Sequence, residues 1–208
     1  MSGLITCDAD VAEGTAWLAL TEPRFAAALV QTGPLPLRLA PDGFAALFNK
    51  IVSQQVSVAS ARAIWGRVEA AGLVTADAVR AASEDDLKAV GLSRPKINYA
   101  RALAEAEIDY DALRMANDAE VLATLTRVTG IGVWTAQVYA MFNLGRADVF
   151  APGDLALQEA VRMVFELPAR PTARELERMA LAWSPWRAVA ARLLFTYYRL
   201  AKDREGMT

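Results

Sequence analysis

The stretch LTRVTGIGVWTAQVYAMFNLGRADVFAPGDLALQ, residues 125–158, decides the fold class of this chain. Apolar residues recur at helical spacing on both sides of the turn Gly130-Ile131-Gly132, so we expect a hairpin between two short helices. Glycine permits the positive φ angles that such a turn uses. The turn also bares backbone N–H groups at the start of the second helix, where the helix dipole favours an anion such as a phosphate oxygen. Taken alone, however, a G-x-G turn is more often a tight connection than a binding site.

The rest of the chain has sequence features that mark the ends of helices. Glycine and proline clusters separate segments with helical periodicity, and we interpret these segments as eight to ten helices, with Thr75 and Ser83 among the N-caps. Strand-like alternation is scarce. The one weak strand candidate, residues 35–39 (LPLRL), contains Pro36 and is typical of a sheet edge or a loop. We therefore expect an all-α fold.

The 208 residues of the chain are 54% hydrophobic, which is enough for a real core.

Two residue types, cysteine and histidine, limit the chemistry of this chain. Cys7 is the single cysteine, so an internal disulfide, a cysteine zinc site and an iron-sulfur cluster are excluded. The chain has no histidine, which excludes a Ser-His-Asp triad and imidazole metal ligands. Any catalysis must use carboxylates, hydroxyls, amines or backbone dipoles.

The charge balance argues against a protein that coats nucleic acid without selectivity. There are 22 basic and 24 acidic residues, a net charge of −2, whereas such proteins are usually basic. A protein that grips only a few phosphates needs only a local basic patch. The N-terminus lacks the basic start of a signal peptide, and no apolar run reaches the roughly 18 residues of a membrane span. We expect a cytoplasmic protein.

Four motifs together resemble the helix-hairpin-helix DNA glycosylase superfamily, and most closely its 3-methyladenine DNA glycosylase II family. They are the hairpin with its downstream aspartate, IVSQQVSVASA at 51–61, GLSRPKINYARALA at 91–104 and WSPWRAVAARLLFTYY at 183–198. The resemblance covers the chain from about Phe44 and implies a short form without an N-terminal β domain. It implies two helical lobes with a DNA-binding cleft between them. The central lobe is 42–144, with the helix-hairpin-helix motif at about 118–143, and the terminal lobe is 1–41 plus 145–208.

The resemblance implies a monomeric base-excision repair enzyme that binds damaged double-stranded DNA and hydrolyses the N-glycosidic bond of alkylated purines, the 3-methyladenine type of substrate. Such an enzyme would associate with the nucleoid when it binds DNA. It assigns the catalytic carboxylate to Asp154. A fixed anion stabilises the positive charge that develops on the sugar as the base departs. An N-alkylated purine is already cationic, so no general acid is compulsory. The competing interpretation of Asp154 is a simple N-cap of the following helix, and both roles are compatible.

The resemblance also implies a base pocket and a product. Trp134 occupies the position where lyase-type relatives carry an attacking lysine, so the enzyme is expected to be monofunctional and to leave an abasic site. Trp134 and Phe195 would stack against a flipped, electron-poor base, although core packing is an equal alternative for Trp134. Val138 stands where the long form has a pocket tyrosine, which makes this pocket less aromatic.

Further residues are implied to hold the DNA. Gln54 and Gln55 would enter the minor groove, with Gln55 filling the gap left by the flipped nucleotide, unless the pair is only a solvated helix end. Gly130 and Gly132 would donate backbone N–H groups to a phosphate. The basic residues expected near phosphates are Arg94, Lys96, Arg101, Arg127 and Arg146. No cofactor is expected to be required, but a monovalent cation is possible at the hairpin, held by the backbone carbonyls of Thr126, Val128 and Ile131.

Two rival functions stay open at the level of sequence. One is a non-catalytic helix-hairpin-helix DNA-binding protein. Asp154 argues against it, since an anion beside a phosphate-lined surface lowers the affinity for DNA. The other is a glycosylase for uracil or deaminated bases, which differs only in the shape of its base pocket.

Overall fold

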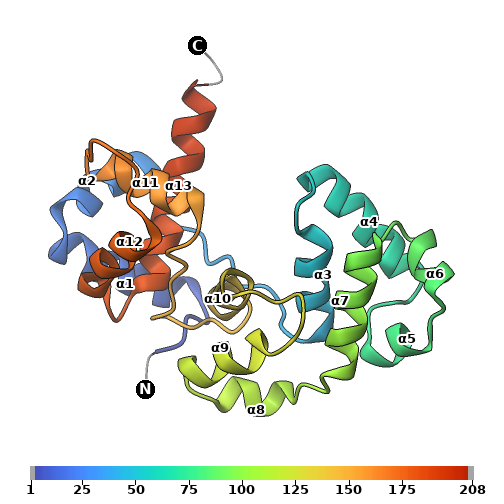
Figure 1. The fold of residues 1–208 in the computed structure, drawn as a ribbon. Helices are drawn as coiled ribbons and strands as arrows, with labels where there is room; N and C mark the ends of the chain where they lie inside the picture. Colours follow the sequence, from blue (N-terminus) through green and yellow to red (C-terminus); the bar gives the residue numbers. More distant parts are fainter. Residues whose placement is uncertain (1–2, 206–208) are drawn as a thin grey trace. The chain divides into compact units, whose positions relative to one another are not determined.

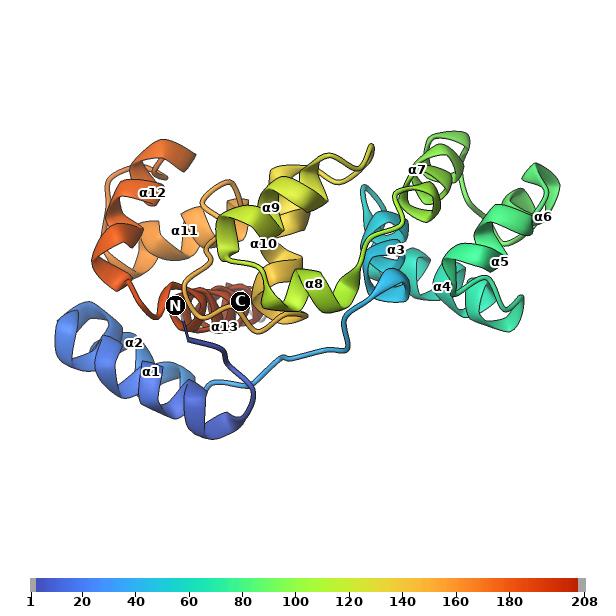
Figure 2. The same ribbon diagram turned by 90° about the horizontal axis from the view of Figure 1, so that it is seen from below.

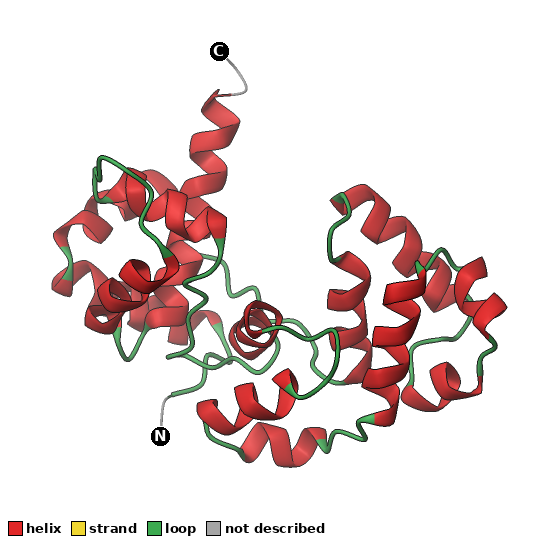
Figure 3. Cartoon of the chain, viewed as in Figure 1, coloured by secondary structure: helices red, strands yellow, loops and turns green. Residues whose placement is uncertain are grey.

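The computed structural model describes residues 3–205, and within that range it contains helices, turns and loops but no strand (Figure 3). Contacts divide the chain into two compact units. The first comprises the residues up to Leu39 together with those from Ala140 onward, and the second comprises Ala40–Tyr139. The sequence predicted divisions after residues 41 and 144, whereas contacts put them after Leu39 and after Tyr139, the second one inside a helix.

The second unit contains seven complete helices and most of an eighth among the described residues (Figure 1). They are α3 (Phe44–Ser53), α4 (Val58–Ala70), α5 (Ala76–Ala81), α6 (Glu84–Ala89), α7 (Arg94–Glu105), α8 (Tyr110–Met115), α9 (Asp118–Thr126) and α10 (Val133–Phe142), which continues into the first unit. Side chains cap several N-termini, and the two caps expected at Thr75 and Ser83 are confirmed.

Helix α3 forms the centre of the second unit because its apolar residues recur at spacings of three and four. Leu47, Phe48, Ile51 and Val52 are fully buried on one face. That face packs against α4 and α7, and α7 in turn packs against α5. The opposite side of α3 is left for the polar side chains that line the hollows described below.

The first unit is organised around the long last helix. It contains α1 (Asp8–Thr21), α2 (Pro23–Thr32), α11 (Leu155–Val164), α12 (Ala173–Ala180), the 3-10 turn η1 (Leu181–Trp183) and α13 (Arg187–Glu205). Helix α13 packs against α11, α2 and α1, and α1 lies beside α2 (Figure 2). Trp183 contacts Phe25, Phe150 and Phe165 in an aromatic cluster with ring centroids 5.1 to 5.9 Å apart. Such contacts give this unit its own core.

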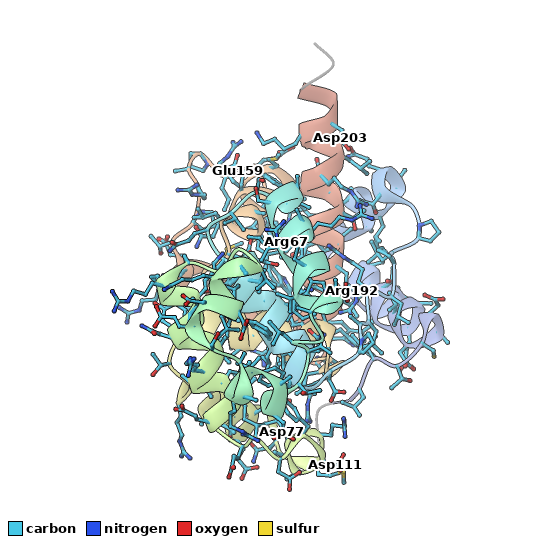
Figure 4. All side chains as sticks on the ribbon, turned by 90° about the vertical axis from the view of Figure 1, so that its right-hand side faces the viewer. Arg67, Asp77, Asp111, Glu159, Arg192 and Asp203 are labelled. Carbon is cyan, nitrogen blue, oxygen red and sulfur yellow. The ribbon has the colours of Figure 1, made fainter. Side chains whose placement is uncertain are left out.

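A buried arginine on α13 ties the segment after α2 to the first unit. The guanidinium of Arg192, which is labelled in Figure 4, donates to the carbonyl oxygens of Leu37 at 2.9 Å, Ala188 at 2.9 Å and Met141 at 3.4 Å. It also lies against the ring of Phe142. Burial lowers the pKa of Arg192 to about 10. These bonds compensate the cost of placing a charged group inside the unit.

The helix count expected from the sequence is too low. The described chain holds thirteen α-helices, and α8, whose N-cap is Asp109, was not anticipated. Residues 35–39 are extended but form no ladder, and the isolated bridge that does occur joins Leu4 to Arg146. Within residues 3–205, no helix has both the length and the apolar character needed to cross a membrane.

Candidate functional site

The two glycines of the hairpin have different roles. Gly130 has a φ of +95°, and a Cβ there would lie 2.4 Å from the Tyr99 ring, so both the backbone and the packing require glycine. Gly132 lies outside the positive-φ region, and a Cβ there would meet nothing within 4 Å. Among the hydrogen bonds that the described turns and loops make between backbone groups, none has the N–H of Gly130 or of Gly132 as its donor. The turn therefore leaves an open surface at Gly132 with donors available to an incoming group.

The three residues whose backbone carbonyls are expected to hold a cation line one hollow of about 550 Å³ in the second unit. The Val128 carbonyl accepts a bond from the Ile131 N–H at 3.0 Å, which leaves it a second lone pair. The hollow is lined by Gln54, Gln55, Ser93, Pro95, Lys96, Tyr99, Thr126, Val128, Thr129, Gly130, Ile131 and Gly132. Thr126, Val128 and Ile131 therefore border the same hollow as the glycine turn.

The adjacent glutamines after α3 point in different directions. The Gln54 side-chain amide donates to the Gly130 carbonyl oxygen at 3.0 Å and lies 3.5 Å from the Thr135 hydroxyl. Gln55 is exposed, with a φ of +55°, a conformation that is uncommon for any residue but glycine. Gln54 therefore braces the hairpin, while Gln55 projects from a strained turn.

A second hollow, of about 610 Å³, lies between α3 and α10 within the second unit. Trp134 is 47% exposed, which is inconsistent with a role confined to core packing. Val138 also borders the hollow, as does Lys50, which was not among the site residues predicted from the sequence. The signal for Lys50 is a lone charge inside the apolar run FAALFNKIV. The lining residues are Asn49, Lys50, Ser53, Gln54, Gln55, Gly132, Trp134, Thr135 and Val138.

The basic residues near the hairpin separate into exposed and tethered side chains. Arg94 and Arg127 are exposed. The Lys96 ammonium donates to the Val52 carbonyl oxygen at 2.6 Å, near the C-terminal end of α3, and burial lowers its pKa. Arg101 donates to the Ala82 carbonyl oxygen, and Arg146 is buried at 7% exposure. Arg101 is thus bonded to the protein backbone and Arg146 is buried, and the sequence predicted neither environment.

In the first unit, Asp154 is the N-cap of α11. Its Oδ1 accepts from the backbone N–H of Ala156 at 2.8 Å and of Leu157 at 3.1 Å. The preceding loop is fixed by the Gln158 side-chain amide, which donates to the Pro152 carbonyl oxygen at 2.8 Å. The N-terminal end of the helix dipole stabilises a negative charge at this position. The carboxylate is thus half-buried, oriented and electrostatically supported.

A second aspartate of the same segment has a different environment. Asp148 accepts two bonds from the Arg187 guanidinium, at 2.8 and 3.0 Å, and one from the Ser184 hydroxyl at 2.8 Å. This bidentate pair anchors the start of α13. Asp148 is therefore committed to structure, and it serves as a natural comparison for Asp154.

Phe195 lies on α13 and is half-buried. Its ring centroid is 6.1 Å from that of Phe142, and the Arg38 guanidinium lies 5.7 Å from the Phe195 centroid. In all, the second unit brings together Trp134, Val138, Gln55 and Gly132, while Asp154 and Phe195 belong to the first unit. No group of three or more Cys, Asp or Glu residues in the described range is arranged to hold a metal ion.

Comparison with known proteins gives consistent matches. A family model described as "HhH-GPD superfamily base excision DNA repair protein" matches residues 48–186. The chain is 30% identical over 165 residues to DNA-3-methyladenine glycosylase 1 of Schizosaccharomyces pombe, covering 74% of this chain and 72% of that protein. It is also 30% identical over 171 residues to DNA-3-methyladenine glycosylase 2 of Escherichia coli, covering 76% of this chain and 57% of that protein.

Solved structures show the same fold. A DNA-3-methyladenine glycosidase from Bacillus halodurans is 30% identical with a TM-score of 0.78, covering 89% of this chain and 88% of that one. The Schizosaccharomyces pombe enzyme in complex with abasic DNA has a TM-score of 0.79 at 23% identity, covering 91% of this chain and 97% of that one.

Proposed function

The chain belongs to the HhH-GPD superfamily of base excision DNA repair proteins, and we propose that it releases N-alkylated purines from DNA with Asp154 as its catalytic carboxylate. It is a DNA glycosylase of the alkylated-base type, an enzyme that hydrolyses N-glycosidic bonds in base excision repair. The observation that carries the assignment of Asp154 is its position at the N-terminus of α11, held by two backbone N–H groups.

The proposed reaction uses this carboxylate as a fixed anion. As the bond between C1′ and the base breaks, the bonding electrons leave with the cationic base and positive charge develops on the sugar. The Asp154 carboxylate is preoriented and stabilises that charge more in the transition state than in the ground state. A water molecule then adds to C1′ and passes its proton to the carboxylate or to solvent.

We assign the base pocket to the hollow beside Trp134. Trp134 is about half exposed and lines the hollow. An electron-poor base is stabilised by stacking on an aromatic face. Val138 adds apolar area without a second ring on that wall. Phe195 is proposed as a second aromatic contact to the base.

DNA is the partner of this chain, and the proposed contacts to it are made mainly by backbone N–H groups of the protein. The N–H groups of Gly130 and Gly132 would bind a phosphate, with Arg94 and Lys96 as further phosphate contacts. Gln55 would fill the gap left by the flipped nucleotide, and its exposed, left-handed conformation supports that role. Gln54 would act indirectly, by holding the hairpin in place.

A monovalent cation is proposed at the hairpin, and the position of Thr126, Val128 and Ile131 around one hollow supports it. These three carbonyls would hold it, and the cation would attract a DNA phosphate to the turn. We propose no other cofactor. We also propose that the enzyme acts as a monomer and is monofunctional, because Trp134 has no amine with which to attack the sugar.

The test is to incubate the protein with duplexes that carry one N7-methylguanine and then to treat them with alkali, which breaks the strand at abasic sites. The expected result is alkali-dependent cleavage at the lesion. Binding without any cleavage would instead support a non-catalytic DNA-binding protein. A duplex that carries uracil, assayed in parallel, tests whether the pocket also accepts a deaminated base.

A further inference from the structure

Lys50 lies in the hollow assigned above to the damaged base, yet the proposed reaction gives it no role. It is half-buried on α3, and its neighbours in the lining are Asn49, Ser53 and Gln54 on one side and Trp134 and Val138 of α10 on the other. Among the described residues that line this hollow, Lys50 is the only one with an ionisable side chain. A charged group placed there faces whatever the hollow receives.

Burial alone lowers the pKa of Lys50 to about 8. The titratable side chains on the neighbouring helices are Arg62, Arg67 and Glu69 on α4, Arg94, Lys96, Tyr99, Arg101 and Glu105 on α7, and Tyr139 on α10. None of them is among the described lining residues, and none contributes to the lowered pKa. Near neutral pH the ammonium form still predominates, but it gives up its proton far more readily than an ordinary lysine does.

The two chemical classes of damaged purine respond differently to such a group. An N-alkylated purine already carries a positive charge, so it leaves without a proton and is repelled by an ammonium. A neutral damaged purine must leave as an anion unless an acid supplies a proton to one of its ring nitrogens or oxygens. A proton donor with a pKa near the working pH is suited to that task.

We propose that Lys50 is a catalytic acid for neutral damaged purines, a role that the release of cationic purines does not require. The proposal rests on the proposed function, because it takes the hollow beside Trp134 as the base pocket. The bond between C1′ and N9 breaks with its electron pair going to the purine, and the Lys50 ammonium transfers one proton to that purine. Water adds to C1′ and loses its proton to the Asp154 carboxylate. Asp154 then releases that proton to solvent, and the Lys50 amine takes one up from solvent.

The test compares single-turnover base release from two duplexes, one with a single hypoxanthine as the neutral purine and one with a single N7-methylguanine as the cationic purine. Lys50→Met keeps the length and apolar stem of the side chain and removes the acid. We expect it to lower the ratio of hypoxanthine to N7-methylguanine release by about 100-fold, the usual size of a general-acid contribution. Lys50→Arg keeps the charge but holds its proton, so it should also lose most hypoxanthine release.

A measurement on the unmodified protein guards against a folding defect in the variants. Hypoxanthine release should decline as pH rises above about 8, while N7-methylguanine release should not decline. An equal loss on both duplexes, full hypoxanthine activity in Lys50→Arg, or no hypoxanthine release at all would overturn the proposal. Absence of release from the N7-methylguanine duplex would contradict the proposed function itself, and the role of Lys50 would fall with it.

Discussion

The side-chain amide of Gln54 donates a hydrogen bond of 3.0 Å to the carbonyl oxygen of Gly130, across 76 residues of sequence. This bond joins the end of α3 to the hairpin turn. Since Gln54 borders both hollows of the second unit, it fixes the wall that they share. A bond of this kind positions a site without itself touching the reacting atoms.

Gln54→Ala should lower the free energy of unfolding by about 1 kcal/mol, because a partly buried hydrogen bond is lost. It should also weaken DNA binding, since the hairpin is no longer held by α3. Denaturant unfolding and a binding titration measure the two effects. Gln55→Ala is the stability control, because Gln55 is exposed and a nearly unchanged unfolding free energy is expected there. Equal stability of both variants and the unmodified protein would show that the bond to Gly130 contributes nothing.

Asp154→Asn should reduce base release by two orders of magnitude or more, which corresponds to roughly 3 kcal/mol of transition-state stabilisation. Asparagine still caps a helix, so the fold should persist, and DNA affinity should hold or rise slightly as an anion is removed. Single-turnover kinetics on N7-methylguanine DNA measures the loss. Asp148→Asn is the matched control: it breaks the pair with Arg187 and should cost stability while the folded protein keeps its rate. Similar rates in the two variants would contradict the assignment.

Substitutions at the two hairpin glycines should separate folding from DNA binding. Gly130→Ala forces a Cβ into the Tyr99 ring at a φ of +95° and should destabilise the protein by more than 1 kcal/mol. Gly132→Val meets open space, so the unfolding midpoint should change little. Affinity for every DNA sequence should nevertheless fall alike, because a backbone contact is blocked and no base is read. Unaltered DNA affinity in a folded Gly132→Val protein would show that the hairpin is only a turn.

The product should be an intact abasic strand that breaks only after alkali, because Trp134 cannot form a Schiff base. Borohydride added during the reaction should therefore trap no protein–DNA adduct. The measurement is gel analysis of the reaction with and without borohydride. Efficient trapping would reveal an amine nucleophile, and Lys50 and Lys96 would be the residues to replace first.

Lys50 should also make stability depend on pH in a defined direction. Its folded-state pKa is about 8, below the ordinary value of 10.5, so between these values the unfolded chain binds the additional proton. Stability should therefore rise as pH increases from 8 to 10.5, and below pH 8 the full cost of burying the charge is present. At neutral pH, Lys50→Met should be more stable than the unmodified protein by up to roughly 3 kcal/mol. That difference should shrink above pH 8; a constant difference across this range would show that Lys50 is not desolvated in the fold.

The sequence by itself determined the class of fold, the hairpin and the superfamily. The fold class and the hairpin follow from local patterns, because apolar spacing, capping residues such as Thr75 and Ser83, and glycine turns act within a few residues of one another. The N-cap at Asp154 was predictable for the same reason. The short helix α8 was not, because its six residues give no readable period and its N-cap is an aspartate, Asp109, among other acidic residues, whereas α5 and α6 have Thr and Ser caps. The superfamily was implied by the resemblance of four motifs to its members.

Only the tertiary structure decided what the polar side chains around the hairpin do. Gln54 turned inward to Gly130, Lys96 to the end of α3, and Lys50 into the hollow beside Trp134. The same structure made Gly130 obligatory, through Tyr99, and left Gly132 open. Each of these outcomes depends on a contact between segments far apart in the chain. Such contacts are set by how helices pack, and no spacing within one segment specifies them.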